Sequence, residues 1–131
     1  MGSDPRILLS PSPDEAHLVI SGKDAKVVVG GNVRMKNATA RIEFEIPATG
    51  FADVPLSANG FSDTVEGASI VVRADRNWPA GSRQVLVRSV SALGGELANL
   101  RLLSENKKIR VRCIGNEIVA SNVAGLVVLV R

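Results

Sequence analysis

Two stretches of this chain alternate strictly between apolar and polar residues, and that period of two constrains the fold more than any other feature. Residues 39–46 read Thr-Ala-Arg-Ile-Glu-Phe-Glu-Ile, and residues 108–114 read Lys-Ile-Arg-Val-Arg-Cys-Ile. Successive side chains of a β-strand point to opposite faces, so each stretch is predicted to be a strand with one buried and one wet face. The predicted buried set is Ile42, Phe44, Ile46, Ile109, Val111 and Cys113. The predicted exposed set is Arg41, Glu43, Arg110 and Arg112.

Shorter strand signals recur along the rest of the chain, at residues 17–20, 25–29, 32–35, 68–73, 84–90 and 117–120. Gly115-Asn116 is a turn pair that predicts a β-hairpin between residues 108–114 and 117–120. Residues 96–103 fit a strand or a helical face, and a short strand is expected near 51–56 within the irregular residues 48–67. No repeat of fixed period is present. We therefore predict an all-β chain, an antiparallel β-sandwich or barrel (jelly-roll or immunoglobulin-like) of about 8–10 short strands.

The two ends of the chain differ from its middle. Residues 1–14 contain Pro5, Pro11 and Pro13, which remove backbone donors, and enclose the apolar tripeptide 7–9. We predict an N-terminal proline-rich arm, residues 1–14, followed by a single β domain, residues 15–131. Residues 124–131 are apolar on both strand faces, which is typical of a central strand or of one that another subunit covers. The candidate partner-docking residues are Ile7, Leu8, Leu9, Arg110, Arg112, Val128 and Val130.

The residue types that carry most chemistry are scarce. The chain has one His, one Cys, one Trp and no Tyr, whereas a structural zinc site needs about four His or Cys ligands. Phosphate-binding, dinucleotide-binding and nucleophile-elbow glycine motifs are absent. We expect no catalytic residue, no metal and no cofactor, and interpret His17 and Cys113 as structural. The chain is predicted not to be an enzyme.

Charge and hydropathy exclude two kinds of partner. The net charge is only +3, and the basic residues 107, 108, 110 and 112 have no aromatic residue among them, so we expect no nucleic acid. That stripe is better explained as a solvated sheet face or a docking face for an acidic partner. No apolar run approaches the roughly 18 residues of a membrane span, and no signal peptide is evident at the start. Localisation stays open between virion and cytoplasm.

One loop combines an aromatic ring with polar groups. Asp75, Arg76, Asn77 and Trp78 are consecutive, and such a set could bind a glycan. The alternative is that Trp78 packs over a sheet edge while Pro79 fixes the turn. Both interpretations leave the loop as the candidate ligand-binding segment.

Three classes of function remain. The first is a structural or assembly module that binds copies of itself, for example as a trimer, or a larger scaffold; decoration, fibre and tail domains of virions are built in this style. The second is a carbohydrate- or receptor-binding module. The third is an accessory immunoglobulin-like domain of a longer protein.

Overall fold

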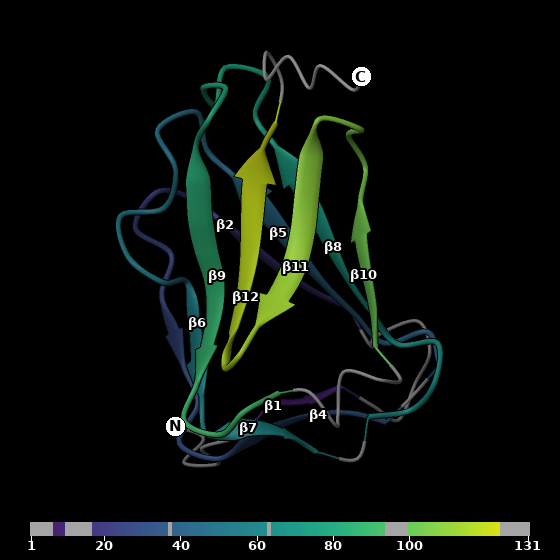
Figure 1. Ribbon diagram of the computed structural model, residues 1–131. Helices are drawn as coiled ribbons and strands as arrows, with labels where there is room; N and C mark the ends of the chain where they lie inside the picture. The colour runs from purple at the N-terminus through teal and green to yellow at the C-terminus, as the bar shows by residue number, and fades with distance from the viewer. Residues whose placement is uncertain (1–6, 10–16, 37, 63, 94–99, 124–131) are drawn as a thin grey trace.

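The computed structural model describes residues 7–9, 17–36, 38–62, 64–93 and 100–123. These described residues form strands and no helix, which confirms the all-β prediction (Figure 1). The strands are β1 (Ile7–Leu9), β2 (His17–Ser21), β3 (Val27–Val28), β4 (Asn32–Met35), β5 (Arg41–Ile46), β6 (Leu56–Ala58), β7 (Gly60–Ser62), β8 (Ser69–Ala74), β9 (Arg83–Ser89), β10 (Arg101–Ser104), β11 (Ile109–Ile114) and β12 (Glu117–Asn122).

The chain winds through three sheets in a repeating order, as in a three-sided β-solenoid (Figure 1). Within the described ranges, sheet A has the strand order β1-β4-β7, sheet B β10-β8-β5-β2, and sheet C β11-β12-β9-β6-β3. The first coil, β1 to β3, gives one strand to each sheet, and the second (β4 to β6) and third (β7 to β9) coils repeat that path. Strands of successive coils pair in parallel in all three sheets.

The parallel register stacks apolar residues of successive coils. Phe44 lies between Ile20 and Val72, its partners on the neighbouring strands of sheet B. The length of a coil varies, because the partners His17 and Arg41 are 24 residues apart whereas Ser69 and Arg101 are 32 apart. This variation explains why a stacked fold shows no fixed period in its sequence.

Antiparallel pairing is confined, among the described strands, to one side of sheet C. There β12 pairs antiparallel with both β9 and β11, and Gly115 turns the predicted hairpin with a φ of 62°. All other pairings are parallel, so the predicted antiparallel sandwich or barrel is not the architecture of sheets A and B. The sequence pattern did not distinguish the two, because side chains alternate across parallel and antiparallel strands alike.

The core lies between the three sheets and is nearly all aliphatic. Its large, fully buried side chains include Val33 and Met35 from sheet A, Ile42, Phe44, Ile70 and Val72 from sheet B, and Leu56, Val87 and Ile118 from sheet C. The irregular residues 48–67 contribute as well, because Phe51 and Phe61 are both buried. Three sheets facing inward thus form the single core that a chain of this length can bury.

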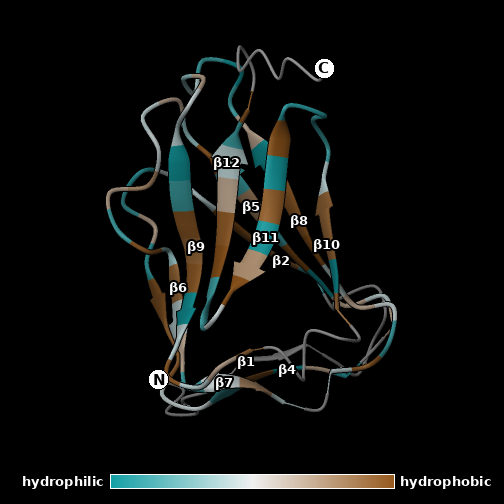
Figure 2. Ribbon diagram, viewed as in Figure 1, coloured by the Kyte–Doolittle hydropathy of each residue, from teal (hydrophilic) through white to brown (hydrophobic). Residues whose placement is uncertain are grey.

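Most of the predicted burial pattern is confirmed. Ile42, Phe44, Ile46 and Ile109 are buried and Arg110 and Arg112 are exposed, while Val111, Cys113 and Arg41 are partly buried. Figure 2 shows the alternation directly, as hydrophilic and hydrophobic bands along β11.

Glu43 is the exception, because its side chain is only 3% exposed although we predicted it to face solvent. It lies on the outer face of sheet B, where side chains from three strands surround its carboxylate: His17 of β2, Arg41 of β5 and Arg73 of β8. A flat solvated face was the wrong expectation, because long neighbouring side chains cover this position.

Candidate functional site

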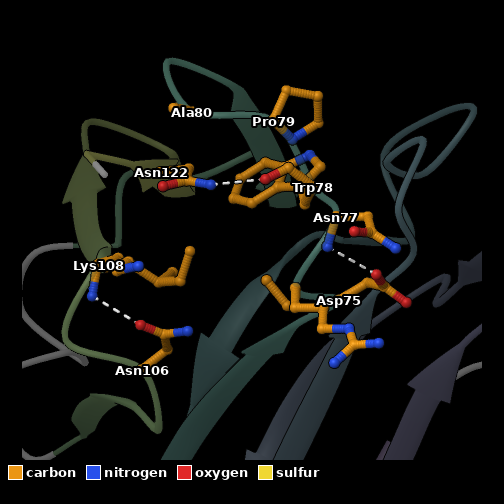
Figure 3. A pocket seen from close by; sticks show the side chains of 11 residues that line it. Asp75, Asn77, Trp78, Pro79, Ala80, Asn106, Lys108 and Asn122 are labelled. Atoms are coloured by element: carbon orange, nitrogen blue, oxygen red, sulfur yellow. Dashed lines mark hydrogen bonds between the residues drawn. The ribbon is translucent and has the colours of Figure 1, made fainter. Parts of the chain in front are cut away.

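A pocket of about 290 Å³ lies where the β8–β9 loop meets the β10–β11 turn and the end of β12 (Figure 3). All four candidate ligand-binding residues are in its wall. The lining residues are Ala74, Asp75, Arg76, Asn77, Trp78, Pro79, Ala80, Asn106, Lys108, Ile109 and Asn122.

The loop that forms one wall is held by its own short-range hydrogen bonds. The Asp75 carboxylate accepts a hydrogen bond from the backbone N–H of Asn77 at 2.8 Å, and the Asp75 carbonyl accepts one from the N–H of Trp78 at 2.9 Å. Aspartate often makes such a turn with the residue two positions later. The turn leaves the side chains of Asp75, Arg76 and Asn77 exposed at the pocket.

Trp78 belongs to the hydrophobic core rather than to an exposed binding platform. It is 4% exposed, and its carbonyl accepts a 2.7 Å hydrogen bond from the buried side chain of Asn122. Sugar recognition through an aromatic residue needs an accessible ring face. The indole therefore positions the loop, and polar neighbours supply the groups available to a ligand.

The opposite wall comes from residues that were not predicted to contribute to a ligand site (Figure 3). Asn106 accepts a hydrogen bond from the backbone N–H of Lys108 at 2.8 Å, and Asn122 ends β12. Residues 104–107 read Ser-Glu-Asn-Lys, a composition typical of a turn. Nothing in the sequence indicates that this turn meets the β8–β9 loop, because the juxtaposition depends on β10 pairing with β8.

The pocket combines several kinds of polar group that can bind a hydroxyl-rich ligand. Asp75 supplies a carboxylate, Asn77 and Asn106 supply amides, and Lys108 supplies an ammonium group. These groups can donate to and accept from sugar hydroxyls. Neither an imidazole nor a thiol is among the described residues of its wall.

His17 and Cys113 lie on different sheets, in β2 and β11. The Nε2 atom of His17 lies 3.3 Å from a Glu43 oxygen and 3.4 Å from Nε of Arg41. Burial raises the pKa of the Cys113 thiol, which lowers its thiolate fraction near neutral pH. The interpretation of both residues as structural therefore stays a prediction.

Ion pairs extend from Glu43 across the outer face of sheet B. Its carboxylate lies 3.1 Å from Arg73 Nη1 and 3.5 Å from Arg41 Nη2. Arg73 also contacts Glu105 at 3.0 Å, and this hydrogen bond raises the pKa of the Arg73 guanidinium. We call Glu43, His17, Arg41, Arg73 and Glu105 the Glu43 cluster.

The candidate docking residues have separate locations. Ile7, Leu8 and Leu9 form β1, which pairs with Val33, Arg34 and Met35 at the edge of sheet A. Arg110 and Arg112 are exposed on β11. Val128 and Val130 lie outside the described residues.

The described part of the chain has neither a metal-binding cluster nor a membrane-spanning helix. No group of three or more His, Cys, Asp or Glu residues there could hold a metal ion. None of its segments is a helix long and apolar enough to cross a membrane.

Comparison with known proteins gives no relative for this fold or pocket: no protein-family model matches the chain, and no curated protein or solved structure is significantly similar to it.

Proposed function

We propose that this protein is a non-enzymatic assembly module that binds another copy of itself or a larger scaffold, as decoration, fibre and tail domains of virions do. The observation that carries the proposal is the arrangement of the first coil. Its strands β1, β2 and β3 each lie at one edge of sheets A, B and C, respectively. One end of the solenoid therefore presents three strand edges together.

Open strand edges favour association. Each edge strand carries backbone N–H and C=O groups that a further strand can pair with, and stacked-coil proteins usually need a cap at such an end. Within the described residues, no strand pairs with the outer side of β2 or β3.

Two exposed apolar side chains lie on these edges. Val19 of β2 is 46% exposed and Val28 of β3 is 69% exposed. Both occupy outward positions, because Val19 pairs with Glu43 and Val28 pairs with Ser57, and both partners face away from the core. Edge strands with few charges are the ones that most readily pair with another chain.

Light scattering over a range of concentrations tests the proposal. We expect the full chain to self-associate, and we expect Val19→Lys with Val28→Lys to reduce its molar mass to that of the 13.8 kDa monomer. Lysine on an edge strand opposes further pairing without removing core packing.

The matched control changes two exposed valines away from the first coil, Val65 and Val90, to lysine. This control should assemble like the unaltered chain. A chain that is monomeric at every concentration, or a control that dissociates as fully as the edge variant, would overturn the proposal of self-assembly through the first coil.

A carbohydrate- or receptor-binding module is the second candidate, and the polar pocket favours it. We expect a glycan-array signal that Asn77→Ala abolishes, because the Asn77 side chain is exposed at the pocket. Trp78→Ala is a poorer test, since removal of a buried indole destabilises the fold. An array without signal, or a signal that Asn77→Ala leaves unchanged, contradicts binding in this pocket.

A further inference from the structure

We propose that the β11 edge of sheet C binds an extended acidic segment of a partner protein by strand addition. This edge is at the opposite side of sheet C from β3, so the inference goes beyond the proposed self-association and does not depend on it. Two independent observations support it: unpaired arginines on the outer face of this sheet, and an open strand edge beside two of them.

Three exposed arginines lie on the outer face of sheet C. Arg110 and Arg83 flank Ser121 of β12, one on each side, and Arg112 is two residues along β11 from Arg110. Strand spacing places Arg83 about 10 Å and Arg112 about 7 Å from Arg110. The three residues form what we call the arginine face.

The arginine face has no acidic partner within the described ranges. Glu117 is the nearby carboxylate of that face, and it is bound to Arg88 at 2.8 Å. No ion pair joins Arg83, Arg110 or Arg112 to another described residue. A planar guanidinium group is suited to bidentate binding of a carboxylate, so three unpaired ones complement an acidic ligand.

The edge of β11 supplies the backbone half of the interaction. Ile114 and Glu117 close the two-residue turn as a hydrogen-bonded pair. Hydrogen-bonded pairs alternate along an antiparallel ladder, so Arg112–Val119 and Arg110–Ser121 are hydrogen-bonded pairs as well. The backbone groups of Val111 and Cys113 therefore point away from β12. Among the described strands none pairs with β11 on that side; β10 lies close to β11 but pairs with β8 in sheet B.

A strand added at this edge would bring alternate side chains beside Arg110 and Arg112. Its residues repeat every two positions with the same spacing as those of β11, so carboxylates at i and i+2 meet the two guanidinium groups. An extended acidic polypeptide can pair with the free backbone groups of β11 and with the guanidinium groups of the arginine face. A nucleic acid would satisfy only the charges, and this face has no aromatic residue for base stacking.

The test uses two capped peptides of equal composition, Ser-Val-Glu-Val-Glu-Val-Ser and Ser-Glu-Glu-Val-Val-Val-Ser, titrated into the full-length isotope-labelled protein. We expect the alternating peptide to shift the amide resonances of Val111 and Cys113. We also expect it to bind about 1.4- to fivefold more tightly than the block peptide, since it presents two carboxylates to the arginine face and the block peptide only one.

Charge reversal supplies the protein-side control. Arg110→Glu with Arg112→Glu should abolish binding of the alternating peptide, whereas Lys23→Glu with Lys36→Glu, an equal charge change at exposed residues of other segments, should leave it unchanged. Retained amide dispersion shows that each variant is folded. Equal binding of the two peptides, no binding, or arginine-dependent binding of a short DNA duplex in place of the peptide would each overturn the proposal.

Discussion

Glu43 gives the sharpest test of the packing on the outer face of sheet B. Its carboxylate is 3% exposed, while its partners Arg41 and Arg73 are 40% and 46% exposed. Glu43→Gln keeps the shape of the side chain but removes the charge that these guanidinium groups share. A hydrogen bond to a charged group contributes about 1.5–3 kcal/mol, and solvent at the half-exposed arginines reduces that contribution. We expect the free energy of unfolding to fall by about 1–3 kcal/mol.

Urea denaturation followed by circular dichroism measures this change, with Glu117→Gln as the matched control. Glu117 pairs with Arg88 at 2.8 Å, but it is 25% exposed and its partner is 53% exposed. An exposed pair of this kind contributes at most about 1 kcal/mol. The double variant Glu43→Gln with Arg73→Gln should cost less than the sum of the two single changes, because the two side chains share one ion pair.

The result that refutes this reasoning is a Glu43→Gln variant that loses no more stability than Glu117→Gln. Solvent would then reach the Glu43 carboxylate in the folded protein. The ion pairs of the Glu43 cluster would be screened like those of any surface pair.

Three further predictions concern single residues. Phe44→Ala should cost about 3–5 kcal/mol in urea denaturation, because a fully buried ring is lost, and a loss under about 1 kcal/mol would contradict its packing. Lys26→Ala should raise the pKa of Asp53 in an NMR titration, because the N–H of Val54 and the Lys26 ammonium hold that pKa below its usual value. The ionised Asp53 therefore stabilises the folded protein at a pH above its unfolded-state pKa, and this stabilisation is lost as the pH falls through its folded-state pKa. Folded Cys113 should react more slowly with a thiol reagent at pH 8 than the unfolded chain, since burial raises its pKa; equal rates would show an accessible thiolate.

The alternating sequence predicted strands well and their partners poorly. Asn32–Met35 is a strand with the predicted bounds, and the hairpin turn at Gly115 was also predicted correctly. These features are local, set by side-chain period and by turn residues. The direction of pairing is not local: Phe44 meets Ile20 and Val72 only because whole coils stack.

Only part of the candidate site could likewise be predicted from the sequence. Asp75, Arg76, Asn77 and Trp78 could be chosen from the sequence because they are consecutive and combine a ring with polar groups. Asn106 and Lys108 could not, since they reach the same pocket through the pairing of β10 with β8. The predicted exposure of Glu43 was wrong for a related reason. Its burial depends on Arg73, which is 30 residues away in sequence and lies on the adjacent strand.

The two ends of the solenoid differ, and the difference predicts the form of any self-association. At the first coil, β1, β2 and β3 are the terminal strands of parallel-paired strands in sheets A, B and C. At its other side, sheet C ends in the antiparallel hairpin of β11 and β12. Sheets A and B end in the parallel strands β7 and β10, but in sheet C a copy stacked head to tail would have to continue parallel coils from the antiparallel edge of β11, which does not repeat the geometry within the chain. Two first coils meeting head to head instead form a closed, two-fold contact that uses the same surface twice. We therefore expect a dimer of twice 13.8 kDa whose mass does not rise further with concentration. Light scattering that shows a growing series of larger species would indicate an open head-to-tail assembly and refute this geometry.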